Sequence, residues 1–289
     1  VLLPGAEYKE ANNSFENEQV FELIRGMFES ERDQLIKAND FNIEIPTDNR
    51  PYFFQFLRLK NMARQWQTLG ERAAFLELGY LIVLVTVVQV FMLAFVLIIL
   101  PLFKLGFKAG KKTWVLFYFS GLGLGYMFLE IVLIKYLVSF LGHPIYAVAT
   151  VITVMLLFSG LGSLYSSRLQ LNKKTVFRIT ALISSLILVY VLLFGFLLRQ
   201  TAGWSIWAKL LITIVSIGIP AFLMGMPFPM GLQLVSKKQQ QLVPWAWGIN
   251  GCISVISTSL ATIIAVESGF TTVMLLASIA YLMASFAMK

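Results

Sequence analysis

Glu130 is the residue whose type and position most strongly suggest chemistry. The apolar stretches LGYMFL and IVLIK flank it, so its carboxyl group is expected near the middle of a membrane span. A charged side chain there is costly unless it is paired, protonated or turned toward the interior of a helix bundle. Two interpretations follow: a proton- or cation-binding site, or a polar contact between helices. Lys135 is a candidate partner, although it lies five residues away and a spacing of four would align the side chains better.

Two further polar residues are candidates for structural or functional roles. His143 is the only histidine and stands in the turn LGHP, where it lacks the partners that a metal site requires. Capping of the following helix is the favoured interpretation. Asn250, within PWAWGINGCISV, is expected to hydrogen-bond across helices. The sequence contains neither HExxH nor GxSxG, so hydrolytic metal and serine chemistry have no support, and we expect no cofactor or metal in this chain.

Glycine and proline gather in two apolar runs. GLGLG at 121–125 has the composition of a nucleotide-binding loop, but it lies inside a membrane run and not between a strand and a helix. Close packing of helix backbones is therefore the favoured interpretation. The run 219–235 contains Pro220, Pro227 and Pro229 and must interrupt helical bonding. Its freed carbonyl groups either line a binding site or are covered by protein.

These residues must be positioned by membrane helices, because the composition excludes a soluble fold. Of the 289 residues, 58% are hydrophobic and 13% are charged, and the mean hydropathy is +0.77. Residues 1–75 carry 9 Lys/Arg and 12 Asp/Glu, whereas residues 76–289 carry 14 and 3. The basic residues of the second part stand between apolar runs, which excludes nucleic acid as the partner and indicates a lipid bilayer. The single cysteine, Cys252, cannot form an internal disulfide.

We expect seven membrane spans, because each needs roughly 20 apolar residues. Their limits are about 76–103, 113–141, 144–166, 176–198, 206–224 with a kinked continuation to 235, 245–266 and 270–288. The loops after the first, third and fifth spans hold most of the lysines and arginines. These loops are therefore expected in the cytoplasm of a bacterial cell whose inner (plasma) membrane the chain crosses. Residues 1–75 are then extracytoplasmic and the C-terminus is cytoplasmic.

The extramembrane segment 1–75 is predicted to be short and mixed in structure. Its expected elements are an amphipathic helix over 14–38, a strand over 41–45, the turn PTDNRP and an interfacial helix rich in aromatic and basic residues. Asp48 and Arg50 are predicted to stabilise the turn that ties the segment to the interfacial helix. The fold class is thus an all-α polytopic membrane protein with a short mixed α/β N-terminal segment, divided into domains 1–75 and 76–289.

Five motifs occur in an order that resembles one family. They are PTDNRPYFF (46–54), GLGLGYMFLEIVLIKYLVSFLGHPIYAV (121–148), LLFSGLGS (156–163), GMPFPMGL (225–232) and PWAWGINGCISV (244–255). Together they resemble the membrane-integrated spermidine synthase-like proteins. The resemblance implies that a Rossmann-like domain, similar to S-adenosylmethionine-dependent aminopropyltransferases and methyltransferases, precedes a TDDRP-type motif and that membrane helices follow. It also implies that Glu130 and His143 belong to family motifs.

The chain departs from this family at its N-terminal part. Asp48 and Asn49 stand where the family motif has two acids, and residues 1–45 are too few for a nucleotide-binding sheet. The chain begins at Val1 and not at methionine, so residues 1–75 are expected to be the tail of a larger soluble domain. Any enzymatic activity is expected to come from a domain outside this chain. Two alternatives remain: a non-catalytic anchor or scaffold subunit that docks partner subunits through residues 1–75, and a transporter of a small cationic solute that uses Glu130.

Overall fold

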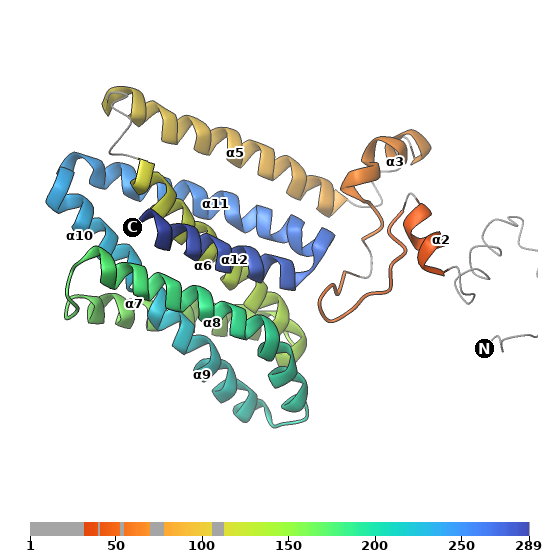
Figure 1. The fold of residues 1–289 in the computed structure, drawn as a ribbon. Coiled ribbons are helices and arrows are strands. Elements are labelled where there is room, and N and C mark those ends of the chain that lie inside the picture. The colour runs from red at the N-terminus through yellow and green to blue at the C-terminus, as the bar shows by residue number, and fades with distance from the viewer. Residues whose placement is uncertain (1–31, 40, 53–54, 70–77, 106–112, 289) are drawn as a thin grey trace, which may run out of the picture. The chain divides into compact units, whose positions relative to one another are not determined.

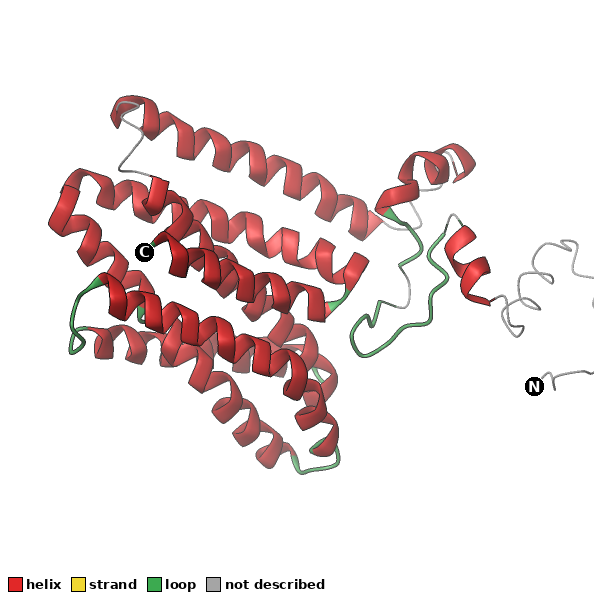
Figure 2. Ribbon diagram, in the orientation of Figure 1, coloured by secondary structure: helices red, strands yellow, loops and turns green. Residues whose placement is uncertain are grey.

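The computed structural model describes residues 32–39, 41–52, 55–69, 78–105 and 113–288 (Figure 1). Its contacts divide the chain into two compact units. The first comprises residues 1–47 and 51–80, and the second comprises residues 48–50 and 81–289. All regular secondary structure among the described residues is helical (Figure 2). The predicted all-α membrane fold is therefore confirmed.

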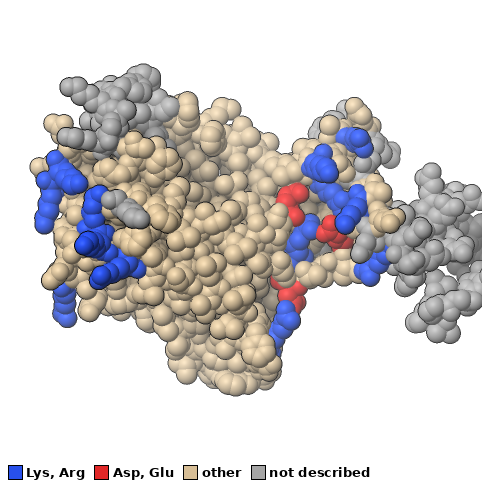
Figure 3. All heavy atoms as spheres, viewed as in Figure 1, with Lys and Arg blue, Asp and Glu red and all other residues tan. Residues whose placement is uncertain are grey.

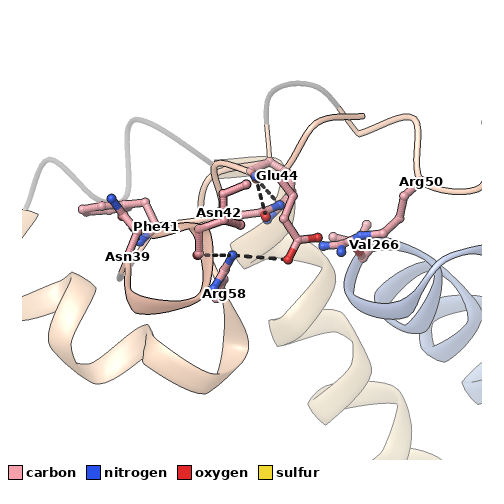
Figure 4. Close-up of polar contacts among 9 residues, drawn as sticks. Asn39, Phe41, Asn42, Glu44, Arg50, Arg58 and Val266 are labelled. Atoms are coloured by element: carbon pink, nitrogen blue, oxygen red, sulfur yellow. Dashed lines mark hydrogen bonds and ion pairs between the residues drawn. The ribbon is translucent and has the colours of Figure 1, made fainter. Parts of the chain in front are cut away.

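The first unit contains short helices tied together by one arginine. Its described elements are α2 (Arg32–Ala38), the 3-10 helix η1 (Leu59–Asn61) and α3 (Met62–Leu69). Nη2 of Arg58 donates to the carbonyl of Ile36 at 3.2 Å, near the C-terminus of α2, and lies 3.4 Å from Oε1 of Glu44 (Figure 4). The cation thus covers a carbonyl that has no partner within α2. Burial raises the pKa of Tyr52 to about 12, so this phenol is neutral at physiological pH.

Two predictions for this segment need correction. The strand expected over 41–45 does not form, since residues 42–46 have no regular secondary structure. Asn42 explains the difference: its backbone N–H donates to Phe56 at 2.7 Å, and its side chain bonds the carbonyl of Gln55 and the N–H of Glu44. Local side-chain bonds of this kind compete with a strand ladder. The helix predicted to lie at the membrane interface begins at η1, later than expected, and continues as α3. Most of the predicted helix 14–38 lies outside the described residues.

The second unit is a bundle of long helices. They are α5 (Leu78–Leu105, whose first three residues belong to the first unit), α6 (Thr113–Leu141), α7 (Pro144–Ser166), α8 (Lys173–Gln200), α9 (Ile206–Met224), α10 (Pro227–Gln239), α11 (Val243–Ser268) and α12 (Phe270–Ala287). By length and apolarity, six segments of the described chain could cross a membrane. The expected number was seven. The difference arises because residues 206–268 count as one 63-residue stretch that includes α9, α10 and α11.

Helix α6 lies at the centre of the bundle, against α7, α11 and α12. Its glycines allow this close packing. A Cβ atom at Gly121 would lie 2.5 Å from the carbonyl oxygen of Ala280 in α12, and one at Gly123 would lie 2.9 Å from that of Asn250 in α11. The run GLGLG therefore serves helix packing, which is the interpretation that the sequence favoured.

The break between α9 and α10 falls within the proline-rich run. Gly225 and Met226 separate the two helices, and Gly225 packs directly against the backbone of Ser159 in α7. The carbonyl of Pro227 accepts a hydrogen bond of 2.6 Å from the buried hydroxyl of Tyr118 in α6. The buried hydroxyl of Tyr118 thus has a partner within the protein, as apolar surroundings require. The contact favours a structural kink over a binding site.

Replacing Gly162 with alanine is expected to destabilise the bundle by about 1–3 kcal/mol. The added methyl group would meet the backbone carbonyl of Phe222 in α9, which cannot move away as a flexible side chain could. Gly160→Ala in the same helix is the matched control, because no atom lies within 4 Å of its Cβ position. Thermal unfolding in detergent compares the two variants. Equal unfolding temperatures would contradict the close contact between α7 and α9.

Candidate functional site

Residues 48–50, from the middle of PTDNRP, belong to the helical unit and lie against the turn between α11 and α12. Gly269 makes this turn with a φ of 85°, a backbone conformation that side chains other than glycine rarely adopt. Because Gly269 has no side chain, it cannot cap the helix that follows it. We call the three residues 48–50, together with this turn, the junction cluster.

Asn49 supplies the missing cap of α12. The backbone N–H of Phe270 donates to the carbonyl oxygen of Asn49 at 2.9 Å. The N–H and the hydroxyl of Thr271 both donate to Oδ1 of Asn49 at 2.8 Å. The first N–H groups of a helix have no partner within the helix, and an asparagine side chain is a preferred acceptor for them. Here the acceptor comes from a residue 222 positions away in the sequence.

Arg50 bonds the other side of the same turn. Its Nε donates to the carbonyl oxygen of Val266 at 2.9 Å (Figure 4). The last carbonyls of α11 are unpaired within the helix and carry its negative dipole end, so a guanidinium group is favourable there. Arg50 therefore bonds the turn between α11 and α12. Its expected role in the turn that leads to the interfacial helix stays a prediction.

Asp48 makes a weaker contact. Its Oδ2 lies 3.4 Å from Nε of Arg199, and the two side chains are 77% and 73% exposed. Exposed ion pairs of this kind contribute about 0–1 kcal/mol, because water screens them. Tyr136 of α6 packs against the junction cluster. The centroid of its ring lies 4.8 Å from that of Phe270, and its hydroxyl contacts Thr271.

Sequence reasoning did not identify Asn49 or Thr271. Asn49 was noted as the position where the chain departs from a pair of acids, although asparagine is also a good helix cap. Two signals together could have identified Asn49. Asparagine is a preferred helix cap, and the helix after the glycine turn has no capping side chain at its own N-cap position. Chain position alone could not connect the two sites.

Glu130 is half-buried at the middle of α6. It forms no hydrogen bond or ion pair with any residue in the described part of the chain. Lys135 is also half-buried, and no ion pair joins the two among the described residues, since five helical positions place them about 140° apart. One turn before Glu130, the hydroxyl of Tyr126 contacts Ser159 of α7.

The other candidates have structural contacts. His143 is the N-cap residue of α7, where its Nδ1 accepts from the N–H of Ile145 at 3.3 Å. Asn250 donates from Nδ2 to the carbonyl of Phe119 at 3.1 Å and so joins α11 to α6. Both arrangements are those favoured from sequence. Thus Asp48 and Arg50 lie together in the junction cluster, while Glu130, Lys135, His143 and Asn250 stand separately. Within the described residues, no group of three His, Cys, Asp or Glu side chains could hold a metal ion.

Charge is distributed unevenly between the two ends of the bundle (Figure 3). One end is formed by the last residues of α7 and α10 and the first residues of α8. Its described charged residues are all basic: Arg168, Lys173, Lys174, Arg178, Lys237 and Lys238. We call it the basic end. The opposite end contains the junction cluster and carries both signs, including Asp48, Arg199 and Glu267.

Comparison with known proteins adds no relative. The chain matches no protein-family model, no curated protein and no solved structure.

Asn49→Ala is expected to lower the free energy of unfolding by about 1–2 kcal/mol, because it removes the acceptor for two donors of Thr271. Asn49→Asp keeps the acceptor and adds a favourable charge at a helix N-terminus, so its stability should match that of the original chain. Asp48→Ala is the neighbouring control and should change stability by less than about 1 kcal/mol. Thermal unfolding in detergent measures all three. A larger loss for Asp48→Ala than for Asn49→Ala would contradict this assignment.

Proposed function

We propose that this chain is the membrane domain of a spermidine synthase-like protein, and that it anchors the extramembrane chain to the bilayer. The observation that carries the proposal is the set of bonds from Asn49 and Arg50 to the turn between α11 and α12. Residues 48–50 belong to the helical unit, whereas residues 51–80, which follow them, belong to the first unit. One of the five motifs of the family resemblance thus supplies the residues that bond this turn.

The polar contacts of the bundle interior support an anchoring role. The hydroxyls of Ser184 and Ser278 form a buried pair 2.7 Å apart, and each lies 3.0–3.1 Å from the other's backbone carbonyl oxygen. The two hydroxyl protons serve two of these three contacts. Tyr118 bonds Pro227, and Asn250 bonds Phe119. Each of these groups uses its hydrogen-bonding capacity to join helices, which is how polar residues hold membrane bundles together. Catalysis is assigned to an S-adenosylmethionine-type domain outside this chain.

The family assignment is tested by the coding sequence upstream of Val1. A glycine-rich turn between a strand and a helix, followed by an acidic residue about 20 positions later, is the expected signature of the cofactor-binding domain. If no such turn is encoded there, the enzyme interpretation fails. The anchor could then still serve as a scaffold that docks partner subunits through residues 1–75.

We further propose that the basic end of the bundle faces the cytoplasm of a bacterial cell and that the chain resides in its inner membrane. The bias of lysine and arginine toward cytoplasmic loops supports this orientation. It puts the junction cluster and residues 1–75 on the extracytoplasmic side.

Fusions to alkaline phosphatase test this orientation, because that enzyme needs disulfides that form outside the cytoplasm. Activity is expected for a fusion before Val1 and for one after Gly203, in the loop between α8 and α9. No activity is expected for a fusion after Gln170, in the basic loop between α7 and α8. The reverse pattern would place residues 1–75 in the cytoplasm, where S-adenosylmethionine is available.

A second candidate, passage of a small cationic solute, is favoured by one observation: Glu130 is a mid-membrane carboxyl group with no ion pair among the described residues. Ionisable residues at such depth often mark ion or substrate paths. The anchor proposal predicts that proteoliposomes of this chain take up no more spermidine than protein-free liposomes. If spermidine is taken up, and if this uptake is lost in Glu130→Gln but retained in the helix-end control Glu267→Gln, the result would contradict the anchor proposal and support transport.

A further inference from the structure

Helix α5 differs from the rest of the bundle in how little of it is covered. In the most apolar 18-residue stretch of α5, 11% of the residues are buried. The corresponding stretches of the other five candidate segments are 28–50% buried. Among the side chains of α5 that the structure describes, Tyr80 and Ala94 are the most buried, at 6% and 3% exposed. Helical geometry places these two about 40° apart and thus on one face of α5.

The opposite face of α5 carries a regular stripe of exposed side chains. Its members follow alternating spacings of four and three residues: Leu78, Ile82, Val85, Gln89, Met92 and Val96. The apolar members are each 49–60% exposed. This repeat of 3.5 residues is the pattern by which one helix packs along another in a left-handed pair. We call these six residues the α5 stripe.

Gln89 is the polar member of the α5 stripe and lies close to its centre. It is exposed and forms no hydrogen bond with any residue that the structure describes. In hydrocarbon, an amide without a partner is costly. The nearby hydroxyl of Thr86 does not share this problem, since it donates to the carbonyl of Ile82 at 2.8 Å within the helix.

We propose that the α5 stripe is the interface between two copies of this chain. All copies insert in the membrane with the same orientation, so a two-fold axis along the membrane normal brings each residue opposite its equivalent at the same depth. Gln89 then meets Gln89. An amide has both donors and an acceptor, so two of them satisfy each other without a third group. A single polar residue within an apolar stripe also fixes the register and the number of helices that associate.

Lipid cannot provide the hydrogen bonds that Gln89 needs. Acyl chains cover the apolar members of the α5 stripe but have no donor or acceptor for the amide. An unrelated membrane helix could do so only if it carried a polar group at the same depth. A second copy carries one by symmetry, and the apolar members on either side of Gln89 then pack against their own equivalents.

Cysteine cross-linking in membranes tests where the copies meet. In a Cys252→Ser background, Val85→Cys lies on the stripe and Phe91→Cys lies about 120° away around the helix. The original side chains are equally exposed, at 56% and 57%, so exposure alone would cross-link both. We expect an oxidised dimer for Val85→Cys at least about fivefold more abundant than for Phe91→Cys, as the close contact within a specific interface requires. Equal yields would overturn the proposal.

Energy transfer between labelled copies in liposomes tests the role of Gln89. Diluting the protein in lipid gives an apparent dissociation constant, which Gln89→Leu is expected to raise about five- to tenfold, in line with interhelical hydrogen bonds in membranes. Thr86→Val is the matched control and should leave association unchanged. Thermal unfolding confirms that both variants fold. A chain that remains monomeric at every dilution, or a Gln89→Leu variant that associates like the original, would refute the proposal.

Discussion

The structure depends on a constraint set by its solvent: where water is absent, every polar backbone group must find a partner within the protein. Within a helix this requirement is met by the helix itself, and it becomes acute where helices end or break. The turn at Gly269 meets it with Asn49 and Arg50. At the break between α9 and α10, the N–H groups of Gly225 and Met226 donate to the carbonyls of Ala221 and Leu223. The partners found at these two places therefore determine where the long helices can stop.

Close approach of helices is the second condition that the bundle satisfies. The glycines of α6 bring its backbone near those of α11 and α12, and Gly162 brings α7 onto α9. Because lipid is as apolar as the side chains, burial alone gives little reason for helices to associate. Dispersion contacts and hydrogen bonds such as that from Asn250 to Phe119 then carry the association. This explains why small residues and amides recur in the motifs of the family resemblance.

The membrane part of the fold could largely be predicted from the sequence. The limits expected for the second and third spans are those of α6 and α7, because Gly142, His143 and Pro144 end one apolar run and begin the next. His143 and Asn250 have contacts of the favoured kind. Local signals do not reveal which distant segments meet, so Asn49 and Thr271 were missed. The strand over 41–45 failed because an alternating pattern does not show that Asn42 bonds to Gln55 and Phe56. Gln89 was overlooked because averaging over an apolar run hides one amide.

The cap that Asn49 places on α12 has a consequence for how the protein is made. Synthesis runs from the N-terminus, so residue 49 leaves the ribosome long before residue 271, its partner 222 positions later. Most of the membrane helices lie in the loop that this contact closes. Contacts of such sequence separation form late, since the intervening chain must first be ordered. The junction therefore remains open until α12 has been made, so that its closure reports that the helices between residues 49 and 271 are already present.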